Sequence, residues 1–146
     1  SGDLPLGLLD VRLSGVVQLA SGLPFNVVTG TDDNLDGFLN ERPEGVPRNA
    51  GEDAPLGPID AIRLAEGLTP APALDEPDFA QLDLRLYRPF RREGGVEGQL
   101  YLQVFNLFNR ENVGLIEGRV TSENFGRPIG LAGPPRTVEL GLRVGF

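Results

Sequence analysis

The chain contains 146 residues, of which 40% are hydrophobic and 23% are charged, and its formal net charge is −8. This composition argues against wholesale disorder, and the acidic balance argues against a nucleic-acid partner. Cys and His are absent, which excludes disulfides, thiolate zinc sites and the nucleophile pairs that depend on an imidazole base.

The first predicted strand covers residues 9–19. Apolar side chains recur there with a spacing of two: Leu9, Val11, Leu13, Val17 and Leu19. This period is typical of a strand with one apolar and one polar face. A shorter strand is expected over residues 24–29. The chain contains no stretch of about 18 apolar residues that could form a transmembrane helix.

Residues 31–78 differ from the rest of the chain in charge and in proline content. They hold 12 of the 21 acidic residues against three arginines, and seven of the 13 prolines. Proline lacks the amide donor that a central strand needs. We therefore expect one long acidic loop here, with only a weak helical period at residues 59–66.

A candidate cation site lies near the start of this loop. Asp32, Asn34 and Asp36 precede Gly37 in the pattern D-x-N-x-D-G, which is the first half of a calcium-binding loop. Alternate oxygen-bearing side chains can surround a hard cation, and glycine permits the sharp turn. The pattern therefore makes calcium the one candidate cofactor.

The second half of the pattern departs from an EF-hand. Pro43 occupies the twelfth position, where an EF-hand has a bidentate glutamate. Asn40, Glu41 and Glu44 are the candidates to complete an irregular site, and Asp33 is an alternative ligand. A solvated Asp/Asn/Gly turn without a metal is the competing interpretation.

Two amphipathic runs after the loop predict a β-hairpin. Leucine recurs at every second position over residues 82–86, and apolar residues alternate again over residues 96–104. The Gly94-Gly95 dipeptide between them predicts the turn. Residues 110–135 are rich in turn formers, with one short strand expected at 115–120.

The last predicted strand runs from residue 137 to the end of the sequence. Its apolar face consists of Val138, Leu140, Leu142, Val144 and Phe146. Together these elements predict an all-β fold of antiparallel amphipathic strands. Such strands fit a soluble sandwich, in which apolar faces pack together, and an outer-membrane barrel, in which the apolar face contacts lipid.

The sequence resembles the C-terminal end of a TonB-dependent outer-membrane receptor barrel. Five segments carry the resemblance, in the order and approximate spacing of that family: 21–25 (SGLPF), 32–43 (DDNLDGFLNERP), 104–112 (VFNLFNREN), 125–128 (FGRP) and the strand at 135–146. They cover nearly the whole chain. FNLFN before an Asn turn, combined with a terminal Phe, is the most specific pair.

The resemblance implies a transmembrane β-barrel of the bacterial outer membrane, with about 22 strands around a plug. Closing a barrel takes about eight strands, so residues 1–146 would form a C-terminal wall segment that cannot close alone. The absence of Met also suggests a piece of a longer chain. The implied partners are outer-membrane lipid, the upstream plug and strands, and TonB only through an N-terminal part outside this sequence.

The resemblance also gives the last strand a role in assembly. In that family the barrel assembly machinery reads a terminal strand of alternating apolar residues by pairing with it. The residues that match this signal are Val138, Leu140, Leu142, Val144 and Phe146.

The resemblance therefore predicts a structural part of a receptor or transporter that is not an enzyme. It provides no catalytic residue and no residue that binds an organic cofactor. Two alternatives remain open: a secreted all-β sandwich module whose acidic loop binds calcium, and a hydrolase that uses carboxylates alone.

Overall fold

A computed structural model describes residues 4–6 and 10–145. The chain divides into two compact units. The sheet unit comprises Ser1–Ala20, Ala80–Glu111 and Pro134–Phe146, and the loop unit comprises Ser21–Phe79 and Asn112–Gly133. Each unit is described by itself.

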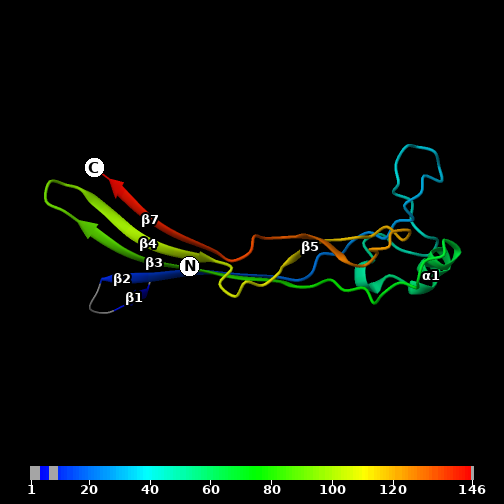
Figure 1. Ribbon diagram of the computed structural model, residues 1–146, viewed down its shortest axis with the longest axis horizontal. Helices are drawn as coiled ribbons and strands as arrows, with labels where there is room; N and C mark the ends of the chain where they lie inside the picture. Colours follow the sequence, from blue (N-terminus) through cyan, green and yellow to red (C-terminus); the bar gives the residue numbers. More distant parts are fainter. Residues whose placement is uncertain (1–3, 7–9, 146) are drawn as a thin grey trace. The chain divides into compact units, whose positions relative to one another are not determined.

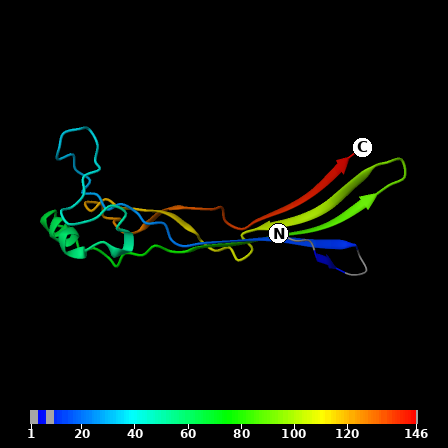
Figure 2. The same cartoon turned by 180° about the vertical axis from the view of Figure 1, so that it is seen from behind.

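In its described residues, the sheet unit contains five strands in the order β1-β2-β3-β4-β7. They are β1 (Leu4–Leu6), β2 (Val11–Ala20), β3 (Phe79–Arg91), β4 (Glu97–Phe105) and β7 (Thr137–Gly145). Figures 1 and 2 show β3, β4 and β7 side by side from both directions. This confirms the all-β fold and, over the described residues, the strands predicted near both ends of the chain; Leu9 lies outside the described residues. Within the described residues the sheet is open, with β1 and β7 at its edges.

The predicted hairpin is formed by β3 and β4. Gly94 and Gly95 both have positive φ, 98° and 85°, which is the backbone conformation that glycine adopts without strain. The amide of Arg92 donates to the carbonyl of Val96 at 2.8 Å and closes the turn.

The register of the sheet places apolar residues in rows on one face. Leu102 lies between Leu86 of β3 and Leu140 of β7, and Val104 lies between Leu84 and Val138. A shift by one residue would move each of these side chains to the opposite face. The alternating apolar residues of β3, β4 and β7 therefore all lie on the same face of the sheet, as the sequence pattern predicts.

A glycine on the other face of β7 makes room for an aromatic ring. Gly141 pairs with Tyr101 of β4, and a Cβ atom built at Gly141 would overlap the ring carbons and hydroxyl of that tyrosine. The tyrosine thus covers the backbone of β7 at a position where any other residue would displace it.

We expect Gly141→Ala to destabilise the sheet by about 1–3 kcal/mol, because the added methyl group overpacks a filled site. Gly145→Ala is the matched control on the same strand and face, since the nearest atom to its Cβ would be 3.8 Å away. The temperature at which the protein loses its folded electrophoretic mobility measures the effect. Equal midpoints for the two variants, or no rescue of Gly141→Ala by Tyr101→Ala, would contradict the expected overlap.

The loop unit has more regular structure than the sequence predicts. It contains a short 3-10 helix at Gly51–Asp53, helix α1 (Leu56–Ala65), and a hairpin of β5 (Val113–Ile116) and β6 (Pro128–Leu131). A single acidic loop was expected over residues 31–78, but the structure shows that residues of this segment pack into a hydrophobic core. The core side chains come from both segments of the unit: Val27, Val46, Ala50, Ala54, Ile59, Val120 and Phe125.

Two local predictions in this unit were inaccurate. The strand expected at residues 24–29 is a single parallel bridge between Val28 and Arg119. Backbone hydrogen bonds from Val28 to Gly118 and from Val120 to Val28 hold it, at 2.9 and 2.8 Å. The strand expected at 115–120 is shifted to Val113–Ile116, because the backbone around Gly118 pairs with Val28 and not with a neighbouring strand.

Helix α1 shows why residues 56–65 are helical despite two prolines nearby. Pro55 precedes the helix and Pro58 lies in its first turn, where no intrahelical amide donor is needed. Ile59 and Arg63, four residues apart, are its buried residues. The helix ends at Ala65, and the turn after it contains Gly67, whose φ is 73°, and the amide of Leu68, which donates to the carbonyl of Arg63 at 2.8 Å.

Candidate functional site

One face of the sheet exposes a continuous set of apolar side chains. On β3, β4 and β7 they are 38–75% exposed: Leu86, Leu100, Leu102, Val138, Leu140, Leu142 and Val144. Soluble proteins rarely present an apolar patch of this extent to water. In a membrane barrel the same residues would contact lipid tails.

The opposite face of the sheet is polar. It carries Gln99, Gln103, Glu139 and Arg143, and the guanidinium carbon of Arg85 lies 4.3 Å from the centre of the Tyr101 ring. Antiparallel strands with apolar residues on one face and charged and amide residues on the other are typical of the wall of an outer-membrane barrel.

The comparison with known families agrees with this class of protein. The family model of an outer membrane beta barrel domain matches residues 9–139. The chain belongs to this family, and the protein is located in the bacterial outer membrane. Neither the curated proteins nor the solved structures provided a match. Among the described residues, no helix is long and apolar enough to cross a membrane.

The residues predicted for assembly lie on β7. Val138, Leu140, Leu142 and Val144 share its exposed apolar face, and β7 pairs along its length with β4. Phe146 lies outside the described residues.

The FNLFN motif forms the turn that follows β4. Asn106 is buried, and Asn106 and Asn109 have φ values of 48° and 52°, which Asn tolerates better than most residues. The Asn106 amide group donates to the carbonyls of Arg110 and Pro134, and its oxygen accepts from the amide of Arg110. The motif therefore connects the end of β4 to the residues that precede β7.

The predicted cation site forms a compact turn in the loop unit. Asp32 accepts hydrogen bonds from the amides of Asp36 at 3.0 Å and Gly37 at 2.9 Å. Asn34 accepts from the amide of Asp36 at 2.9 Å and donates to its carboxylate at 3.1 Å. Gly37 has a φ of 88°, as the sharp turn predicted from the sequence requires.

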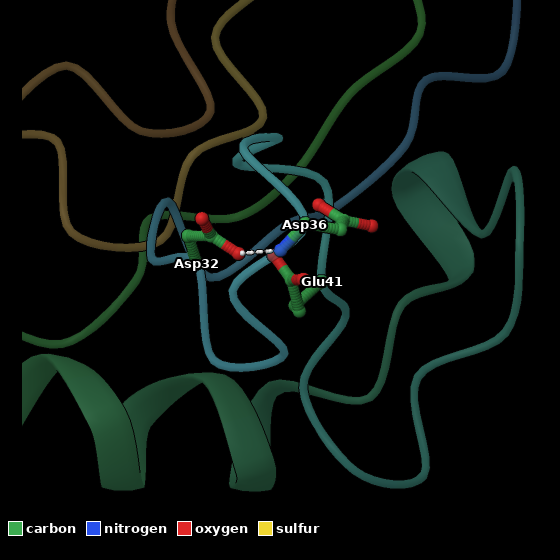
Figure 3. A group of neighbouring side chains, drawn as sticks. All are labelled: Asp32, Asp36 and Glu41. Atoms are coloured by element: carbon green, nitrogen blue, oxygen red, sulfur yellow. Dashed lines mark hydrogen bonds between the residues drawn. The ribbon is translucent and has the colours of Figure 1, made fainter.

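The structure adds Glu41 to this group. One carboxylate oxygen each of Asp32, Asp36 and Glu41 lie within 4.8 Å of one another. Figure 3 shows the three side chains together, with the carboxylate of Glu41 turned toward Asp32. The sequence had named Glu41 as only one of three residues that could complete the pattern, because its distance from Asp32 depends on how the turn closes.

Proposed function

We propose that this chain forms the C-terminal wall segment of a TonB-dependent outer-membrane receptor and takes part in substrate uptake without an enzymatic step. The observation that carries the proposal is the open antiparallel sheet with a lipid-type face. Its five described strands are fewer than the eight or so that close a membrane barrel. Further strands would have to pair at the edges β1 and β7.

The lengths of the connections support a receptor wall. The β3–β4 turn is short and lies at the end of the sheet where β7 finishes, whereas residues 21–78 and 106–136 connect strands at the other end. Outer-membrane barrels have short turns on the periplasmic side and long loops outside. On this basis the loop unit is extracellular, where a receptor would meet its substrate.

The strand β7 supports the proposed partners. Its exposed apolar residues would face lipid, and its outer edge, which pairs with no strand in the described part of the chain, offers amide and carbonyl groups to a pairing strand. In the proposed protein, β7 pairs first with a strand of the barrel assembly machinery during assembly. In the finished barrel it pairs with a strand from the upstream part of the chain. TonB itself would contact only a segment upstream of this sequence.

A conductance measurement tests the receptor proposal. The protein purified from the outer membrane of its own host should have an intact mass several times the 15.7 kDa of this sequence, because about 22 strands and a plug are needed. In a planar bilayer it should give no steady ion current, since the plug fills the lumen. A steady open-channel current from the pure protein would instead indicate a porin, and an intact mass near 15.7 kDa would also refute the proposal.

A further inference from the structure

Glu41 is in an unusual environment for an ionised side chain. Both of its carboxylate oxygens are buried, and neither has a hydrogen-bond partner among the described residues. Removing a charged group from water without a compensating donor or counterion is strongly unfavourable. The Glu41 carboxylate therefore lacks the hydrogen-bond donor or positive charge that would stabilise its ionised form in this conformation.

The backbone holds Glu41 in this position. Its carbonyl accepts hydrogen bonds from the amide of Thr29 at 2.7 Å and from the Thr29 hydroxyl at 3.3 Å. The hydroxyl of Thr31 donates to the Thr29 hydroxyl oxygen at 2.9 Å. These contacts close the segment between Thr29 and Glu41 and fix the backbone of Glu41 at this point of the turn.

The neighbouring carboxylates do not supply the missing positive charge. The hydrogen bonds to Asp32 come from backbone amides, and those to Asp36 come from the Phe38 amide and the neutral Asn34 side chain. Three negative charges are therefore close together, and none of these donors carries a charge. A bound cation would remove both the repulsion and the unpaired state of Glu41.

We propose that this turn binds a calcium ion through Asp32, Asp36 and Glu41, with Glu41 replacing the missing twelfth-position glutamate. Two oxygens bound to one calcium ion can be separated by at most about 5 Å, twice the calcium–oxygen distance. The separation of up to 4.8 Å in this cluster satisfies that limit. Calcium also accepts an irregular set of oxygen ligands, whereas magnesium demands a smaller, nearly octahedral one. The site does not depend on whether the barrel belongs to a TonB-dependent receptor.

Titration calorimetry on the whole protein tests the site. The purified protein is freed of divalent ions with EGTA, dialysed, and titrated with calcium chloride. We expect one site with a dissociation constant of about 10⁻⁴–10⁻³ M, the range of extracellular calcium modules. Glu41→Gln keeps the shape of the side chain but removes its charge, and it should weaken binding at least about tenfold because affinity follows the number of charged ligands. Glu66→Gln changes an exposed acidic residue of the same unit that is not a candidate ligand, and this control should bind as the wild type does.

Hydrogen exchange of residues 29–41 shows whether Glu41 binds calcium or only stabilises the turn. Calcium should slow exchange in the wild type and have no effect in Glu41→Gln. In EGTA the variant should exchange no faster than the wild type, because neutralising Glu41 removes repulsion. The proposal is overturned by no calcium binding at about 10 mM, by equal calcium affinity in Glu41→Gln, by faster exchange of that variant in EGTA, or by equally strong binding of magnesium.

Discussion

Replacing Arg63 with methionine is expected to loosen the loop unit by about 3 kcal/mol, because several carbonyl groups lose their donor together. The Arg63 side chain is 3% exposed and donates to the carbonyls of Val120 at 2.6 Å, Ser122 at 2.9 Å and Thr69 at 2.8 Å. Its guanidinium carbon also lies 5.4 Å from the centre of the Phe125 ring. Methionine keeps most of the apolar stem and removes only the charged end.

Hydrogen exchange measures this effect directly. Amides of residues 118–127 should exchange about 100-fold faster in Arg63→Met, as expected for 3 kcal/mol of local stability. Arg48→Met is the control, because Arg48 is exposed in the same unit and such substitutions usually change stability by less than about 0.5 kcal/mol. Arg63→Lys should be intermediate, since an ammonium group cannot reproduce the planar fork. If Arg63→Met and Arg48→Met exchange alike, the three carbonyl contacts do not stabilise the unit.

Replacing Asn106 with glycine should destabilise the connection between β4 and β7 by about 2–4 kcal/mol, because it removes three side-chain hydrogen bonds from a buried site. Glycine is chosen because it adopts the positive φ of this residue without strain. The loss therefore reports the hydrogen bonds to Arg110 and Pro134 and not the backbone conformation.

Asn109→Gly is the matched variant for this experiment. Asn109 has a similar φ, but it is exposed and accepts one hydrogen bond, from the Arg136 amide at 2.9 Å. We expect it to cost less than about 1 kcal/mol. The amount of folded protein recovered from the outer membrane and the exchange rates of residues 104–112 provide the comparison. Similar losses in both variants would mean that burial of Asn106 contributes little.

The strands of the sheet could be predicted because each of them repeats one simple pattern. Apolar residues at every second position specify both the strand and the face it exposes, as in Val138 to Val144. Gly94-Gly95 similarly specifies a turn by its own conformational freedom. Because these features depend only on residues that are close in the sequence, the sequence of this chain alone is enough to predict them.

The core of the loop unit and the complete acidic turn depend on distant neighbours. Ile59 packs in a core with Val120 and Phe125, and nothing near Ile59 in the sequence identifies those partners. Glu41 lies near Asp32 in a turn whose ends are joined by the hydrogen bond from the Thr29 amide to the Glu41 carbonyl. The sequence therefore predicted the first half of the cation site and left its last ligand open.

The division of the loop unit between two segments also affects how such surface regions can be exchanged between barrels. Residues 21–79 provide most of the buried side chains, but Val120 and Phe125 come from residues 112–133. A chimera that receives only the first segment would expose Val27 and Ile59 to water and leave Arg63 without two of its acceptors. The two segments must therefore be inherited or transplanted as a pair, although β3 and β4 separate them in the sequence.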